Sequence, residues 1–274
     1  MLRARAIRHL TFMIGLAVTC VLLATAALSL VYTPKDPLEM SISGRLQGPT
    51  GSHPFGTDQF GRDLLSRVMT GAVTSILVGV IAVGIGMGLG VLLGVISGYF
   101  GGWLDEGFMR LMDAVQGFPA ILSALLISAV FRPSVGISMV AIGVAFLPVF
   151  ARLTRASFLE LRDRDFVAAA RALGAGDATI IGRHIMPNTV SPLIVQATIS
   201  FPVAILAEAA LAYLGLGTQP PHPSWGLMLR ESQAFLATNP WFAIFPGGAI
   251  ALTVLGLNLL GDGLRDLLDP KQVG

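Results

Sequence analysis

Ionisable side chains that could bind a metal or act on a substrate gather in one segment of this sequence, residues 53–67. The segment holds His53, Asp58, Arg62 and Asp63 among several glycines. A single histidine with dispersed carboxylates lacks the ligand spacing of a zinc site. We therefore predict an ordered surface loop here and no metal site.

The common signatures of enzyme chemistry are missing from the sequence. Its only lysines, Lys35 and Lys271, each follow a proline, so there is no Gly-x-x-x-x-Gly-Lys-Ser/Thr loop to hold phosphates. The sequence also has no zinc-protease motif and no nucleophile elbow. We predict no catalytic residue and no cofactor on this chain, so a process driven by ATP would need another subunit to bind it.

A polar segment at residues 160–188 has the features of a protein-binding projection. Within it, four residues fall at i, i+3, i+4 and i+7 and share one face of a short helix: Phe166, Ala169, Ala170 and Leu173. Gly174 stands where helices commonly end in a left-handed residue. The spacing predicts a bend at Gly174–Gly176, which includes Ala175.

A second short helix is predicted to follow this bend. Asp177 is well placed to cap its start, and Pro187 is predicted to end it. Two short helices with a bend between them would form a compact projection, and such a projection suggests a protein partner.

Composition places this projection on a membrane protein. The 274 residues are 54% hydrophobic and 12% charged, with a mean hydropathy of +0.75, whereas soluble domains carry about 25% charged residues. The net charge is only +2, and the basic residues are dispersed along the sequence. This distribution excludes the basic patch of a nucleic-acid surface. Cys20 is the single cysteine and cannot form an intramolecular disulfide. We predict an all-α protein embedded in a lipid bilayer.

Six apolar segments are long enough to cross a bilayer, because about 20 helical residues span about 30 Å of hydrocarbon. A tail at 1–11 precedes the first span and an external loop at 32–71 follows it. A core at 72–262 holds the other five spans, and a tail at 263–274 ends the chain. The predicted spans are 12–31, 72–97, 111–131, 135–153, 190–214 and 241–261.

The distribution of basic residues predicts that both termini are cytoplasmic. In that orientation twelve of the 18 lysines and arginines lie in inner segments, as positively charged loops do. The projection at 160–188 is then cytoplasmic too. The start of the chain imitates a cleavable signal peptide, but the apolar run continues to Val31, which favours an uncleaved first span.

Four glycines at four-residue spacing align along one face of the second predicted span: Gly86, Gly90, Gly94 and Gly98. Small residues in such a stripe let another helix approach closely. We predict a packing surface, and a sliding surface used in conformational change is compatible with it.

The third predicted span carries two irregularities. Arg110 and Asp113 are three residues apart, which predicts an ion pair on one helix face. Pro119 predicts a kink or a local break.

The fifth predicted span contains Pro202 and Glu208. A carboxylate inside a membrane span is costly and is by default a functional hypothesis. Lining of a substrate path and structural pairing are equally open for these two residues. Beyond this span, Trp225 and Trp241 are predicted to anchor the chain at the membrane interface.

These features resemble the membrane subunits of ABC importers, and in particular the dipeptide, oligopeptide and nickel permeases. The segment Ala168-Ala169-Ala170, then Gly174 and an apolar run ending near Pro187, resembles the EAA loop of that family. The usual Glu of the motif is Ala168 here, which removes one charged contact but keeps the bend and the apolar face. Three further blocks also match the permeases, at 53–67, 98–119 and 225–270.

The resemblance implies a type I ABC importer permease fold in a prokaryotic cell membrane, the inner membrane in a Gram-negative organism. It implies a second homologous permease, two cytoplasmic ATPase subunits that bind ATP and Mg, and an external or periplasmic substrate-binding protein. The EAA loop would dock on an ATPase through Phe166, Ala168, Ala169, Ala170, Leu173 and Gly174, with Ala175 and Gly176 shaping the bend. Dipeptides or short oligopeptides are the first choice of cargo, and nickel or another small solute is the alternative.

An ion-coupled secondary transporter is the alternative from a different class. Such carriers hold ionisable residues deep in their spans and show repeated halves. Here Glu208 is the main such residue, and the sequence shows no convincing internal repeat. A channel-like selectivity filter is also missing, and the polar projection disfavours a purely structural membrane subunit.

Overall fold

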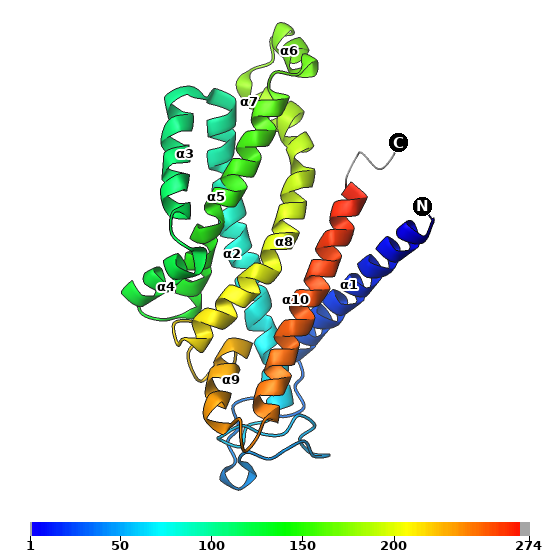
Figure 1. The fold of residues 1–274 in the computed structure, drawn as a ribbon, viewed down its shortest axis with the longest axis vertical. Coiled ribbons are helices and arrows are strands. Elements are labelled where there is room, and N and C mark those ends of the chain that lie inside the picture. The colour runs from blue at the N-terminus through cyan, green and yellow to red at the C-terminus, as the bar shows by residue number, and fades with distance from the viewer. Residues whose placement is uncertain (1, 269–274) are drawn as a thin grey trace.

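The computed structural model describes residues 2–268; Lys271 and the rest of the tail predicted at 263–274 beyond residue 268 lie outside the described residues. Helices and loops make up the described chain (Figure 1), with one isolated antiparallel bridge between Thr57 and Asp63. The α-helices are α1 (Leu2–Ser29), α2 (Leu64–Phe100), α3 (Gly102–Gln116), α4 (Ala120–Val130), α5 (Val135–Leu161), α6 (Asp165–Ala172), α7 (Asp177–Thr179), α8 (Met186–Tyr213), α9 (Trp225–Ser232) and α10 (Trp241–Leu268). Two short 3₁₀ helices (Ile42–Gly44 and Gln233–Phe235) and a π-helical turn (Ile180–Ile185) complete the order.

Five stretches of helix within the described residues are long and apolar enough to cross a membrane. They are Leu10–Ser29, Leu64–Phe100, Val135–Leu161, Asp177–Tyr213 and Trp241–Asp266. Several of these helices extend beyond the predicted spans. In α2, for example, the Asp63 side chain accepts a hydrogen bond from the Ser66 amide at 2.8 Å, so this helix begins at Leu64 and not at 72.

The third predicted span, at 111–131, is divided into two helices. α3 and α4 are long and apolar enough to cross a membrane only when they are counted as one span. The two helices are bent by 84° across a short break. The predicted break at Pro119 is therefore present, but it is a sharp elbow and not a kink in one straight helix. Pro119 lacks an N–H group and cannot continue the α3 hydrogen-bond ladder.

The ion pair predicted on this span is replaced by two others. Arg110 bonds with Glu106 of the same helix, and Asp113 Oδ1 accepts from Arg152 Nη2 of α5 at 2.6 Å. The prediction that Arg110 pairs with Asp113 is wrong, because each side chain has a different partner.

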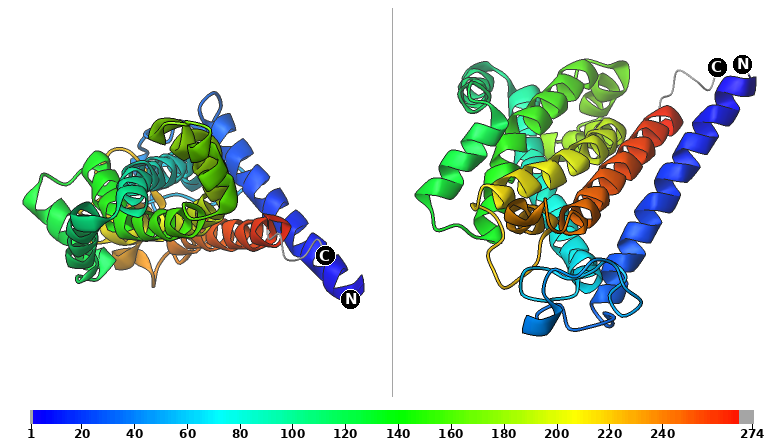
Figure 2. Two further views of the ribbon diagram at one scale, coloured as in Figure 1. Left: turned by 90° about the horizontal axis from the view of Figure 1, so that it is seen from above. Right: turned by 60° about the horizontal axis from the view of Figure 1, so that its bottom comes forward.

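The two ends of the bundle have different structures. The projection formed by α6 and α7 lies at one end, which we call the α6 end, and the loop 30–63 lies with α9 at the opposite end, the α9 end (Figure 1). The start of α1 and the end of α10 both point toward the α6 end. Figure 2 shows α1 at the edge of the bundle, beside α10 and away from α3 and α4.

The glycine stripe of α2 packs directly against α5. A Cβ atom added at Gly86, Gly90 or Gly98 would lie 2.6–2.7 Å from the Cβ atom of Phe146, Phe150 or Phe158, respectively. A Cβ at Gly94 would lie 2.6 Å from that of Thr154. The four α5 residues repeat at the same four-residue spacing as the glycines, so the predicted packing surface is confirmed and its partner helix is α5.

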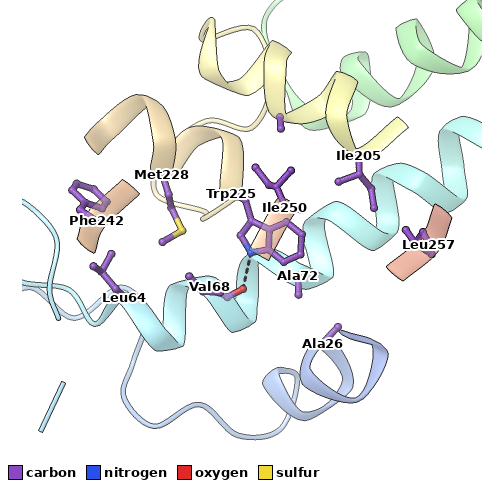
Figure 3. Close-up of a cluster of buried hydrophobic side chains, with 11 residues drawn as sticks. Ala26, Leu64, Val68, Ala72, Ile205, Trp225, Met228, Phe242, Ile250 and Leu257 are labelled. Carbon is purple, nitrogen blue, oxygen red and sulfur yellow. Dashed lines mark hydrogen bonds between the residues drawn. The ribbon is translucent and has the colours of Figure 1, made fainter. Parts of the chain in front are cut away.

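A hydrophobic core closes the bundle at the α9 end. Leu64, Val68 and Ala72 of α2 meet Trp225 and Met228 of α9 there, together with residues of α1, α8 and α10 (Figure 3). The Trp225 indole is buried and donates a hydrogen bond to the Val68 carbonyl oxygen at 2.9 Å. The prediction that Trp225 is an interface anchor is wrong, because α9 folds back into the bundle.

The ionisable residues of the segment 53–67 bond mainly with one another and with nearby elements. Arg62 Nε lies 2.5 Å from Asp58 Oδ2, and Arg67 Nη2 lies 3.1 Å from Glu231 Oε2 on α9. His53 Nδ1 lies 3.0 Å from the α2-capping carboxylate of Asp63. Each charge in this buried network has an opposite charge within reach, as a buried ion pair requires. The geometry gives the segment a structural role.

The glycine stripe yields a stability prediction. Replacing Gly90 with Ala should lower the free energy of unfolding by about 1–3 kcal/mol, because the added methyl group overpacks the contact with Phe150. Gly88 lies on the same helix and is exposed, and a Cβ atom added there would meet nothing within 4 Å. Thermal unfolding of the purified chain in detergent would measure both variants.

Gly88→Ala is the matched control and should leave the melting temperature unchanged or raise it, since alanine favours a helix over glycine by about 1 kcal/mol. Equal melting temperatures for Gly90→Ala and the wild type would show that α2 and α5 are not in close contact.

Candidate coupling surface

The projection begins with α6, which ends as the sequence predicts. Gly174 has a φ of +85°, the left-handed conformation that favours glycine. The amide of Ala175 donates to the Ala170 carbonyl at 3.0 Å, and the Gly174 amide donates to the Arg171 carbonyl at 3.0 Å. These bonds satisfy carbonyl groups at the end of α6 and direct the chain back toward the bundle.

A small separate core holds the projection on the bundle. Val167 and Ala170 of α6 pack with Ile180 and Ile185 of the π-helical turn and with Phe158 near the end of α5. All five side chains are buried. Because α6 contributes one buried face to this core, its orientation relative to α5 is fixed by packing.

The structure corrects two predictions about the second half of the projection. Gly176, and not Asp177, is the N-cap residue of α7. Pro187 does not end a helix, because it occupies the first turn of α8. The π-helical turn before it, in which the Met186 amide donates to the Ile181 carbonyl, widens the backbone ahead of the proline. The chain therefore continues from α7 into α8.

The predicted docking face of α6 is largely exposed. Leu173 is 88% exposed and Phe166 is 41% exposed. Ala169 lies between them and is exposed, as are Ala168, Gly174 and Gly176, whereas Ala175 is partly buried. Ala170 differs from the prediction, because its side chain is buried in the small core beneath the helix.

Polar contacts tie the projection to the end of α2. The Tyr99 hydroxyl donates to Asp177 Oδ1 at 2.6 Å, and Arg162 Nη1 donates to the Gly98 carbonyl at 3.0 Å. Tyr99 also packs its ring against the small core. These contacts join α7, α2 and the end of α5 at one place.

A second set of contacts ties α3 to the same place. The Asp105 carboxylate receives two hydrogen bonds from Arg155, at 2.5 and 2.6 Å, and another from the Ser97 hydroxyl. A bidentate arginine–carboxylate pair fixes geometry as well as distance. The ends of α2, α3 and α5 are thus bonded together directly beneath the projection.

Sequence reasoning missed most of these anchoring residues. Val167 falls next to the predicted face, and helical spacing alone does not say which of two adjacent apolar faces is buried. Arg155 is 50 residues from Asp105 in sequence, and Tyr99, Asp105 and Arg155 belong to three different helices. The residues before α3 showed only a turn, so no sequence signal pointed to their pairing with α5.

Glu208 and Pro202 lie on α8, away from the projection. Both side chains are buried. Glu208 Oε1 accepts a hydrogen bond from the Thr218 hydroxyl at 3.1 Å, in the loop that follows α8. This contact ties the loop to the helix. Glu208 Oε2 is buried without a hydrogen-bond partner among the described residues, so both alternatives stay open for Glu208.

The architecture is that of a multi-pass membrane protein with a type I ABC importer permease fold. A solved structure of the MetNI methionine ABC transporter in an inward-facing conformation matches 75% of this chain and 96% of the matched chain, with a TM-score of 0.59. Sequence identity to that chain is 19%, so this likeness concerns the fold alone.

The chain belongs to the family of binding-protein-dependent transport system inner membrane components, whose family model matches residues 90–274. It is 44% identical to the dipeptide transport system permease protein DppC of Alkalihalophilus pseudofirmus, over 94% of this chain and 85% of that protein. It is 50% identical to the glutathione transport system permease protein GsiD of Shigella flexneri, over 83% of this chain and 75% of that protein. It is also 43% identical to a putative peptide transport system permease protein of Brucella abortus, over 97% and 90%.

The bond between Tyr99 and Asp177 gives a local prediction. Tyr99→Phe keeps the ring in the small core but removes the hydroxyl donor, so it should weaken the attachment of α7 by about 1 kcal/mol. We expect amide hydrogen exchange within 177–185 to become about fivefold faster, while exchange in the bundle core is unchanged.

Tyr32→Phe is a matched control, since Tyr32 follows α1 and its side chain is exposed at the α9 end. This variant should leave the exchange of 177–185 as in the wild type. Unchanged exchange in Tyr99→Phe would mean that the hydroxyl does not hold α7.

Proposed function

We propose that this chain is the permease subunit of an ATP-driven importer of dipeptides or short oligopeptides, and that residues 160–188 receive the force from an ATPase subunit. The single observation that carries this proposal is the exposed apolar face of α6, formed by Phe166, Ala169 and Leu173, on a projection fixed rigidly to the bundle. The names of the relatives support the cargo, because dipeptides, peptides and glutathione are all peptides.

The proposed assembly contains four kinds of subunit. A second homologous permease pairs with this chain, two cytoplasmic ATPase subunits bind ATP and Mg, and an external substrate-binding protein delivers the cargo. The α6 end, with both termini, faces the cytoplasm, in agreement with the distribution of basic residues. Loop 30–63 and α9 then face outward, where they can meet the binding protein.

The mechanism follows from how the projection is attached. Closure of the two ATPases on ATP moves the docked face of α6. The small core and the bonds of Tyr99 and Arg162 carry this displacement into the ends of α5 and α2. Because the glycine stripe packs α2 closely on α5, the two helices move together. Their movement switches the pathway between the two permeases from inward-facing to outward-facing, and hydrolysis of ATP resets it.

The docking claim can be tested at Gly174. A Cβ atom at this position would meet nothing within 4 Å, so a large side chain has space in solvent, although the φ of +85° strains the backbone of residues other than glycine. Gly174→Trp should therefore block ATPase docking and reduce uptake of labelled dipeptide about tenfold or more in cells lacking the wild-type chain. Gly174→Ala is the control, because alanine brings the left-handed backbone strain with a small side chain.

Longer peptides and nickel, supplied to the same cells, would identify the cargo. Rescue of nickel uptake alone by the wild type would keep the mechanism and replace the substrate. Equal uptake by Gly174→Trp and the wild type, at equal expression, would exclude the loop as the docking site.

Glu208 separates this mechanism from an ion-coupled carrier. Glu208→Gln keeps an oxygen that accepts from Thr218 but removes the ionisable group. We expect uptake within about twofold of the wild type, since the structural hydrogen bond survives. Loss of uptake in this variant, with retention in Glu208→Asp, would instead point to a titrating carboxylate and a secondary transporter.

A further inference from the structure

A closed ring of hydrogen bonds fixes the loop 30–63 to the start of α2. Lys35 Nζ lies 3.0 Å from His53 Nε2, and His53 Nδ1 lies 3.0 Å from Asp63 Oδ1. Asp63 Oδ2 accepts from the Ser66 hydroxyl at 2.8 Å, and the Ser66 oxygen accepts from the Lys35 amide at 3.0 Å. The ring thus returns to Lys35, and it joins three stretches of chain that are separate in sequence.

The chemistry of the ring fixes the position of the proton on His53. The Lys35 ammonium group has three donors and no acceptor, so His53 Nε2 must accept from it and carries no proton. Nδ1 then carries the proton of the imidazole and donates it to the Asp63 carboxylate. The ring is therefore closed by a neutral imidazole in the Nδ1–H form.

The imidazole is held in this place from both sides. The His53 carbonyl accepts from the amides of Thr50 and Gly56 at 2.9 and 2.8 Å, and its amide donates to the Thr50 hydroxyl. The Asp63 side chain is 1% exposed and caps α2 through the Ser66 amide. The His53 side chain is 16% exposed, so a proton from solvent can reach it while its partners stay fixed.

A proton added at Nε2 breaks the ring at one bond. Nε2–H is a donor that faces the donors of Lys35 at 3.0 Å, and two positive charges at that distance repel each other. The bond to Asp63 survives and becomes charge-assisted. Protonation of His53 therefore releases the Lys35 side chain but leaves the imidazole on the cap of α2.

The other charged groups near the ring have partners of their own. Lys35 and Asp63 are the charged residues that bond with the His53 imidazole in the described part of the chain. Asp36 accepts from the Leu38 amide, and a separate buried network holds Asp58, Arg62, Arg67 and Glu231 of α9. The parts of α1 and α10 nearest the loop, 16–29 and 241–254, contain no charged residue. The balance between Lys35 and Asp63 thus decides what protonation does.

We propose that His53 is a proton-sensitive latch on the loop 30–63. Neutral His53 holds the first part of the loop on α2 through Lys35, and protonated His53 releases it. Imidazole is the side chain whose charge ordinarily changes between pH 5 and 8, so moderate acidification operates the latch. The latch depends neither on the cargo nor on the ATPase subunits. Only its location on the external side of the membrane rests on the proposed function.

Nitrogen NMR of the purified full chain in detergent, with ¹⁵N-labelled histidine, tests the proton position. At pH 8 the ring nitrogens of His53 should have the chemical shifts of the Nδ1–H form. His222 is exposed in the loop after α8 and is the control; its nitrogens should show shifts averaged over both forms. The variants His53→Gln and His222→Gln assign the two signals.

Amide hydrogen exchange tests the release. Between pH 8 and pH 5, protection of residues 33–40, corrected for the intrinsic pH dependence of exchange, should fall about fivefold, because the Lys35 amide loses its hold on Ser66. Residues 53–63 should keep their protection. The change should disappear in His53→Gln, which has no ionisable group at this position, and persist in His222→Gln.

Two results would overturn the latch. An Nε2–H form of His53 at pH 8 would show that Lys35 does not donate to the imidazole. Protonation of His53 with unchanged protection of 33–40, both measured on the wild type, would show that this bond does not hold the loop. Both measurements use the isolated chain, so a failure of the proposed function in the uptake assay would leave them unaffected.

Discussion

The close contact of α2 with α5 is the constraint on which the rest of this structure depends. Four glycines bring the two backbones together, since a methyl group at any of these positions would overlap α5. The contact continues to Gly98 and Phe158, directly beneath the projection. A wider separation would leave Tyr99 out of reach of Asp177 and would open the small core that holds α6. The exposed face of α6 is thus positioned by packing that begins deep in the bundle.

Charged side chains of this apolar chain pair with one another at both ends of the bundle. Asp105, Arg155 and Ser97 bond together beneath the projection, and Arg62, Asp58 and Glu231 do so at the opposite end. Charge pairs thus hold the helix ends together at both ends of the bundle.

Much of this fold could be predicted from the sequence because the bilayer imposes long apolar helices. Apolar length located the helices, four-residue spacing identified the glycine stripe, and Gly174 marked the end of α6. Three features were beyond the reach of sequence patterns. The position of Trp225 depends on how α9 folds back, and the burial of Ala170 depends on which α6 face meets Phe158. The continuation through Pro187 depends on a π-helical turn, a local widening that hydropathy does not record.

The central claim is that the exposed face of α6 contacts an ATPase subunit, and a photo-reactive amino acid at Leu173 tests it most directly. Leu236 is the control, because it is a half-exposed leucine that follows α9, at the end of the bundle opposite the projection. In membranes containing the whole transporter, illumination should link position 173 to the ATPase and leave position 236 unlinked to it. A chain that carries the probe at 173, assembles normally and gives no ATPase adduct would contradict the account.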